Sequence, residues 1–234
     1  MKVVAIHQPN FFPWLGYFDK MARSDVFIFL DHVQFPKTGG GVWSNRVKIL
    51  IAREPRWVTA PIKRDFHGVA SINKIEWDDG QPWRVKYLKT IAANYSRSPF
   101  YRETMEMLVP LVESPITNLS RFNIEAIKVL AKHVGVRHQH TVASSELQLQ
   151  GTASDLLIEI TQKVNGSAYM CGGGAAGYQQ DEAFERAGIR LVYQGFEHPK
   201  YLQNGSTEFV AGLSIIDALM NIGQVGVCEL LRKI

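Results

Sequence analysis

The chain has 234 residues, of which 46% are hydrophobic and 21% are charged, and its formal net charge is +4. This composition is typical of a globular protein with a well-buried core, and it excludes a largely disordered or fibrous chain. The basic surplus is mild, and the sequence has no dense basic run, zinc-finger spacing or aromatic RNA-binding signature. We therefore expect no dedicated nucleic-acid binding.

Cysteine usage and hydropathy indicate the compartment. Cys171 and Cys228 form no CxxC pair, which favours a reducing environment over a disulfide framework or a zinc ribbon. The apolar run in residues 1–7 is too short for a secretory signal, and no run is long enough to span a membrane. We expect a cytoplasmic protein without membrane insertion.

The hydrophobic pattern predicts a βαβ unit at the start of the chain. Residues 3–7 form an apolar run, residues 15–23 carry an apolar helical face, and residues 26–30 form a second apolar run. Such a unit normally has parallel strands and a right-handed crossover. Ligands of open parallel sheets bind beyond the carboxyl ends of the strands, so we expect the site there.

The rest of the chain continues this α/β pattern around a helical middle segment. A glycine-rich loop is predicted at 35–45, and extended segments at 45–51 and 56–61. Three amphipathic helices follow between residues 83 and 132, the second kinked or shortened by Pro110. The remaining predictions are strands at 137–142, 168–170 and 190–194, and helices at 154–164, 182–187, 213–221 and 224–231, the last two divided at Gly223.

These elements predict an α/β fold with a mostly parallel sheet and flanking helices, of nucleotidyltransferase-like or Rossmann-like type. We expect a single domain over residues 1–234, with a helical lobe at about 83–133. The last two helices offer a surface for a homodimer.

The loop after the first strand, residues 6–18, contains two prolines, a glycine and five aromatic residues. Aromatic side chains in a loop either line a ligand pocket or pack on the core as a rigid connection. We favour the floor of a pocket. The candidate residues here are Gln8, Asn10, Trp14 and Tyr17.

Two polar residues end the first two strands. His7 is the candidate general base, because its ordinary pKa lies near working pH, although a single histidine is often structural. Asp31 ends an apolar strand, where an unpaired carboxylate would be costly, so it is expected to orient His7 or a substrate hydroxyl. His138 and His140 alternate on a predicted strand, but no third ligand accompanies them and we predict no metal.

A glycine-rich turn follows the strand at 168–170. Its glycines allow close backbone approach and free N–H groups for an anion, or alternatively serve only tight packing. Cys171 precedes the turn and is either an acyl-carrying nucleophile or a small buried residue. The candidate binding residues of this turn are Gly172, Gly173, Gly174 and Tyr178.

Further binding residues are expected in three loops. Lys37 and Arg46 could neutralise a diphosphate, or belong to a solvated charged surface. Gln34 and Asn45 lie beside them in the sequence. A polar aromatic loop supplies His198, Tyr201 and Gln203, which could hydrogen-bond a sugar or a base.

The sequence resembles the WbqC-like family, bacterial proteins encoded among genes for O-antigen and other surface-polysaccharide synthesis. One departure is Cys171, where similar proteins often have serine. The residues that carry the resemblance include Gln8-Pro9, Pro13-Trp14-Leu15-Gly16-Tyr17-Phe18, Val33-Gln34-Phe35, Asn45-Arg46, Gly174-Ala175, His198-Pro199, Leu213-Ser214-Ile215 and Asp217.

The resemblance implies transfer of glycine or another small acyl group to a sugar. We therefore predict a transferase that acts on a nucleotide-linked sugar or another anionic small molecule. Its co-substrate is an acyl or aminoacyl donor or ATP. In this prediction His7 removes a proton, Asp31 positions the acceptor, and Arg46 with the glycine turn binds phosphate or an oxyanion.

Two alternatives remain open at this point. One is a nucleotide- or nucleotide-sugar-binding protein of nucleotidyltransferase-like fold without nucleotidyl transfer. At the positions of that fold's His-x-Gly-His pattern the chain has Trp14, Leu15, Gly16 and Tyr17, so both histidines are absent. The other is a non-catalytic scaffold of the same pathway.

Overall fold

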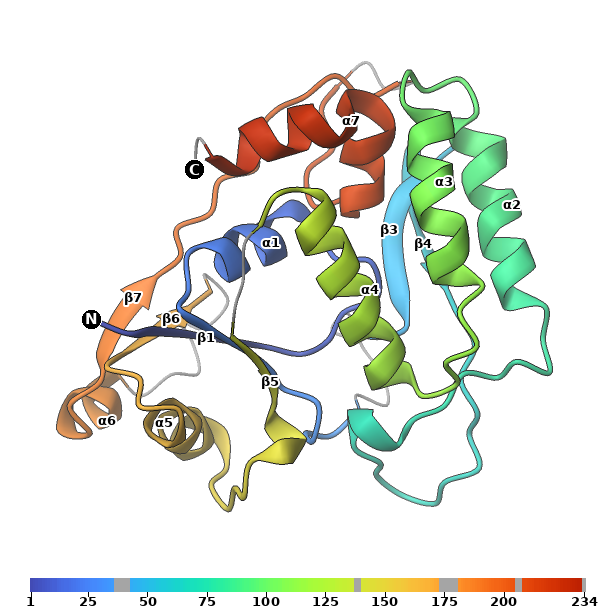
Figure 1. Cartoon of the computed structure of the whole chain (residues 1–234). Coiled ribbons are helices and arrows are strands. Elements are labelled where there is room, and N and C mark those ends of the chain that lie inside the picture. Colours follow the sequence, from blue (N-terminus) through green and yellow to red (C-terminus); the bar gives the residue numbers. More distant parts are fainter. Residues whose placement is uncertain (36–42, 137–139, 173–180, 205–207, 233–234) are drawn as a thin grey trace.

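A five-stranded parallel sheet forms the centre of the structure, a computed structural model that describes residues 1–35, 43–136, 140–172, 181–204 and 208–232 (Figure 1). The strand order is β5-β2-β1-β6-β7, and all neighbours are parallel. Counted by position along the chain within this sheet, the order is 3-2-1-4-5, as in Rossmann-like folds. The strands are β1 (Val3–His7), β2 (Val26–Phe29), β5 (Thr141–Ala143), β6 (Ala168–Cys171) and β7 (Arg190–Tyr193).

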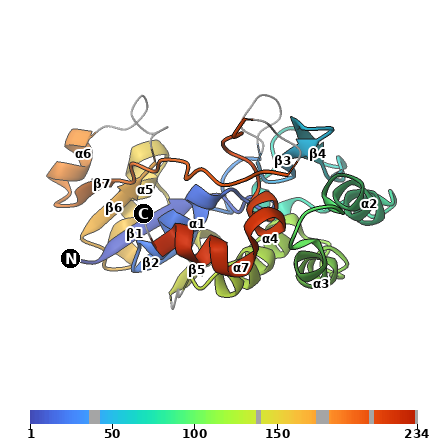
Figure 2. The same cartoon turned by 90° about the horizontal axis from the view of Figure 1, so that it is seen from above.

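Helices cover both faces of the sheet, which gives three layers (Figures 1 and 2). On one face lie α5 (Ala153–Lys163) and α6 (Asp181–Arg186). On the other lie α1 (Leu15–Ala22), α4 (Leu119–His133) and α7 (Ile215–Arg232). Successive strand residues point to opposite faces, so both faces of each central strand must be apolar.

The side chains of β1 demonstrate this alternation. Val4 and Ile6 pack in one cluster with Ile160 of α5 and Phe184 of α6. Ala5 belongs to the larger cluster that contains the buried residues of α1, α4 and α7. The near-continuous apolar runs in the sequence are therefore a direct consequence of the helices that cover both faces of the sheet.

The segment between β2 and α4 lies beside the sheet (Figure 1). It contains an antiparallel hairpin, a 3-10 turn and two helices, all of which precede α4 in the chain. These are β3 (Arg46–Ile51), β4 (Glu54–Thr59), η1 (Ile72–Lys74), α2 (Trp83–Tyr95) and α3 (Tyr101–Val112).

The rings of Phe11 and Phe12 pack into the core, where each is 1% exposed. Phe11 lies 5.5 Å from the Trp77 ring, and Phe12 stacks on Tyr87 at 5.5 Å. The expectation that the loop after β1 forms a pocket floor is therefore wrong for these two rings. The alternative, a rigid buried connection, describes them, because aromatic residues distant in sequence close around the loop.

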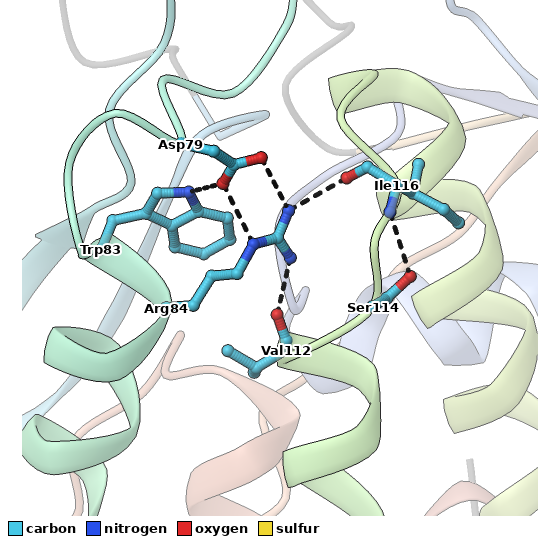
Figure 3. Close-up of polar contacts among 6 residues, drawn as sticks. All are labelled: Asp79, Trp83, Arg84, Val112, Ser114 and Ile116. Atoms are coloured by element: carbon cyan, nitrogen blue, oxygen red, sulfur yellow. Dashed lines mark hydrogen bonds and ion pairs between the residues drawn. The ribbon is translucent and has the colours of Figure 1, made fainter.

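A polar clamp joins the helices of this segment (Figure 3). The Arg84 guanidinium donates to both carboxylate oxygens of Asp79 at 3.0 and 3.3 Å, and to the carbonyls of Val112 at 2.6 Å and Ile116 at 3.0 Å. It also lies 4.5 Å from the Trp83 ring centre. Burial alone would raise the pKa of Asp79, but the hydrogen bonds from Arg84 and Trp83 outweigh it and lower the pKa. The start of α2 is thereby fixed to the end of α3.

The α/β class, the parallel sheet and the flanking helices are confirmed. The predicted strand at 137–142 is observed only from Thr141, and residues 137–139 lie outside the described part. Helix α3 continues two residues beyond Pro110. Gly223 divides α7 as predicted, with φ of 67° in the left-handed region. Among the helices of the described residues, none is long and apolar enough to cross a lipid bilayer.

Candidate functional site

The order of strands reverses between β1 and β6. From β1 the chain moves outward to β2 and then β5, and it later returns to the other side of β1 as β6. Parallel pairing of β1 with β6 ends at Ala5 and Met170, whereas pairing with β2 continues to His7 and Phe29. The crevice outside the carboxyl ends at such a switch point is the usual ligand site of open α/β sheets.

Lys20 of α1 occupies the point where β1 and β6 separate. Its side chain is buried, with 4% exposed, and Nζ donates to the carbonyl of Ile6 at 3.0 Å. Ile6 is the first β1 residue beyond the pairing with β6. Burial lowers the pKa of Lys20 from 10.5 to about 8, although the nearby Cys171 thiol acts in the opposite direction. An amine with this pKa exchanges protons near neutral pH.

His7 ends β1 beside Lys20. Its Nδ1 lies 3.1 Å from the Gln8 carbonyl, which places the ring proton on Nδ1 and leaves Nε2 as an acceptor. The Tyr17 ring lies 4.7 Å away, and its hydroxyl donates to the same carbonyl at 3.1 Å. Burial lowers the pKa of His7 to about 3, with a further contribution from the Lys20 charge against an opposing one from the Gln8 carbonyl. His7 is therefore neutral at pH 7 and a weaker base than the sequence suggests.

Cys171 ends β6 with its side chain fully buried. Its Sγ donates to the Val192 carbonyl at 3.6 Å, and it packs with the cluster under α5 and α6. These surroundings favour the small buried residue that the sequence left open. A Cβ added at Gly172 would meet no atom of the described residues within 4 Å. Lys37, Gly173, Gly174 and Tyr178 lie outside the described residues.

Asp31 follows β2 and is buried, with 4% exposed. Its Oδ1 accepts from Ser144 Oγ at 3.1 Å and Ser145 N at 2.9 Å, and Oδ2 accepts from Ser145 Oγ at 2.8 Å and Ser120 Oγ at 3.5 Å. The carboxylate therefore organises the end of β5 and the start of α4 rather than the His7 ring. Asp31 also lines a pocket with Ser120 and Ser145.

Tyr201 and Gln203, in the loop between β7 and α7, converge on a different carboxylate. Tyr201 donates to Asp217 Oδ2 at 2.7 Å, and Gln203 Nε2 donates to the same oxygen at 3.2 Å. Tyr95 donates to Oδ1 at 2.9 Å and accepts from Leu50 N at 2.9 Å. Burial raises the pKa of Asp217 against these hydrogen bonds. The arrangement links hairpin, α2 and α7, and indicates a structural role for Tyr201 and Gln203.

Trp14 and His198 come together at the start of α1. Their ring centres lie 5.1 Å apart, and both rings are half-buried. Gly212 N donates to His198 Nδ1 at 3.3 Å, and burial lowers the pKa of His198. The two rings are tilted by 36° and form a partly exposed surface at the end of the loop that follows β1.

The remaining candidates lie on or near the hairpin. Asn45 Nδ2 donates to the Ala60 carbonyl at 3.0 Å, and the Arg46 guanidinium lies 4.4 Å from the Trp57 ring centre. Gln34 is exposed, and Asn10 is buried. Within the described ranges no group of three or more His, Cys, Asp or Glu side chains could hold a metal ion.

Sequence reasoning did not select Lys20 or Asp217 as functional or organising residues. A usable signal existed for both, because each is a charged residue within a helix whose neighbours are almost all apolar. Seven of the eight α1 residues are buried, including Asp19 and Lys20. A buried charge must be paired or must shift its pKa, so such a position carries a stability cost that calls for a reason.

The fold and the site define a Rossmann-like α/β protein with a lysine and a histidine at the switch point of its sheet. The model of the WbqC-like protein family matches residues 8–228, and the chain belongs to this family. It is similar to the uncharacterized protein Rv1507c of Mycobacterium tuberculosis, with 31% identity over 229 residues, or 95% of each chain. No solved structure matches.

Proposed function

We propose that the protein is a transferase that moves a small acyl or aminoacyl group onto a nucleotide-activated sugar. The observation that carries the proposal is the position of Lys20, whose Nζ donates a hydrogen bond to the Ile6 carbonyl where β1 and β6 separate, beside the neutral His7. Membership of the WbqC-like family supports surface-polysaccharide synthesis as the setting.

The chemistry assigned to this pair is proton transfer. The neutral amine of Lys20 accepts a proton from the attacking amine or hydroxyl of the sugar as the new bond to the acyl carbon forms. His7 Nε2 accepts a hydrogen bond from the same group and orients it. The bond between the acyl carbon and its carrier then breaks, and the carrier leaves with the proton from the Lys20 ammonium.

This assignment makes Lys20, rather than His7, the group that exchanges the proton. General acid–base catalysis is most effective when the pKa lies near the working pH, and burial brings the pKa of Lys20 to about 8 and that of His7 to about 3. The route involves no covalent intermediate on Cys171, whose thiol is fully buried.

The convergence of ionisable groups supports an enzyme rather than a scaffold. A scaffold needs no buried lysine, and retaining one costs stability that a packing residue would not. Perturbed groups of this kind cluster at functional sites.

The test is a transfer assay read by mass spectrometry. Purified protein is incubated with a panel of nucleotide-linked amino and deoxy sugars, together with acyl-CoA donors or with glycine and ATP. We expect one sugar to gain the mass of the acyl or aminoacyl group. Lys20→Met should abolish the gain, whereas Lys132→Met, an exposed lysine on α4, should keep it. Absence of any gain across the panel would refute the proposed function, and full turnover by Lys20→Met would refute the role assigned to Lys20.

A further inference from the structure

A polar pocket of about 250 Å³ lies between the carboxyl ends of β2 and β5 and the first half of α4. Asp31 of its lining follows Leu30, whose N donates to the His7 carbonyl at the end of β1 at 2.8 Å. Its lining combines apolar side chains with polar and charged ones. The residues that the argument uses are Asp31, Asn73, Ser120, Arg121, Ser145 and Glu146.

The polar part of the lining offers both donors and acceptors. The hydroxyls of Ser120 and Ser145 donate to Asp31, which leaves their oxygen lone pairs to accept from a ligand. Asn73 Oδ1 accepts from Ser71, so the Asn73 amide NH₂ is available to donate. Arg121 is exposed and forms no ion pair within the described part of the chain.

The charge of the pocket argues against a polyphosphate. Its lining contains three carboxylates, Asp31, Glu125 and Glu146, and two cations, Arg121 and Lys128, so the acids exceed the bases by one. Lys128 is moreover paired with Glu125 at 3.5 Å. A ligand that bears many hydroxyls satisfies donors and acceptors together, and needs no net charge.

The size and the apolar lining residues of the pocket point to a single ring. Its volume is below the range of about 300–1,000 Å³ that is typical of drug-sized ligands. Phe29, Ile124 and Ala143 supply apolar surface for the C–H groups of such a ring. A whole nucleotide sugar would extend beyond it.

We infer that this pocket binds the sugar ring of the acceptor, as a neutral polyhydroxylated monosaccharide unit, with Arg121, Asn73 and the Asp31–serine group as its hydrogen-bonding partners. The identification of the sugar as the acceptor rests on the proposed function. This position puts the sugar near the end of β1.

The inference is tested by binding without turnover. Saturation-transfer NMR is recorded with glucose, N-acetylglucosamine and glucosamine, and with glycine and inorganic diphosphate as competing ligand classes. We expect saturable binding of at least one sugar, weakened about tenfold by Arg121→Gln, which removes a charged donor. Asn73→Ala should also weaken sugar binding. Lys132→Gln, which removes an exposed cation on the same helix as Arg121, should not weaken it.

Three results would overturn the inference: no saturable sugar binding, sugar binding that Arg121→Gln and Asn73→Ala both leave intact, or binding of glycine or diphosphate alone. Its failure is distinguishable from failure of the proposed function. Sugar binding should survive Lys20→Met. If this variant kept full turnover while sugar binding still depended on Arg121 and Asn73, only the proposed role of Lys20 in transfer would be refuted. If Lys20→Met lost turnover while Arg121→Gln and Asn73→Ala left sugar binding intact, only the assignment of the sugar to this pocket would be refuted.

Discussion

Replacing Lys20 by methionine separates a catalytic lysine from a structural one. Methionine has a similar length and no charge, so the substitution fills the same space while removing the ammonium. A catalytic lysine held in an unfavourable environment should be dispensable for stability. A structural lysine should not.

The expected stability change follows from the pKa of Lys20. Its lowering from 10.5 to about 8 corresponds to about 3 kcal/mol of penalty for the buried ammonium. The variant loses one hydrogen bond to the Ile6 carbonyl and leaves that oxygen unpaired, which costs about 1–3 kcal/mol. The net result at pH 6.5 is a variant about as stable as the wild type or more stable by up to about 2 kcal/mol.

The sign of the pH dependence follows from the same lowering. Between pH 8 and 10.5 the unfolded lysine is protonated while the folded lysine is neutral, so the wild type gains stability as the pH rises through this window. Relative to the variant it should gain about 2 kcal/mol by pH 9.5. Below pH 8 both states bind the proton and the penalty is fully present.

Urea denaturation of both proteins at pH 6.5 and pH 9.5, followed by circular dichroism, measures these differences. Lys132→Met is the control, because this exposed lysine on α4 should give equal differences at both pH values. A Lys20→Met variant less stable than wild type by more than about 3 kcal/mol at pH 6.5 would refute the reasoning, since the lysine would then stabilise the fold.

Three further predictions concern stability. Tyr95→Phe should lower the free energy of unfolding by about 1–3 kcal/mol, because the Tyr95 hydroxyl bridges the hairpin and α7. Tyr87→Phe should leave the free energy of unfolding nearly unchanged, because the buried Tyr87 hydroxyl has no partner in the described residues, and equal losses of stability in urea denaturation would contradict this. Arg84→Met should lower the free energy of unfolding by about 2 kcal/mol, and the exposed Lys89→Met on the same helix should not, as measured by thermal unfolding. The folded pKa of His7 is about 3 against 6.5 unfolded, so the native state loses stability as the pH falls from 6.5 towards 3, and His7→Gln should reduce this loss in denaturation at pH 4 and pH 7.

The alternation of strands and helices was predictable because both faces of the sheet are buried. Strands with two buried faces appear as continuous apolar runs, and α1 and α7 have helical periodicity. The division of α7 at Gly223 was also predictable from the local sequence, because a left-handed φ favours glycine.

The contacts of the aromatic loop and of the polar site residues were not predictable in this way. Phe11 and Phe12 meet partners contributed by α2 and α4, and the sequence contains no local sign of that closure. The sequence singled out Asp31 as an acid that ends an apolar strand, but its partners at the start of α4 and after β5 depend on how those segments return to β2. Lys20 was overlooked because a lysine on a short amphipathic helix usually extends to solvent.

The place of β1 at the middle of the sheet has a consequence for synthesis on the ribosome. Its neighbour β2 emerges soon afterwards, but β6 is the thirteenth strand-or-helix segment of the chain to be made, counting 3-10 turns. One side of β1 therefore stays unpaired through most of translation, and its exposed peptide groups can recruit other chains. Slow, non-local completion of the sheet should make nascent or destabilised chains dependent on holding chaperones.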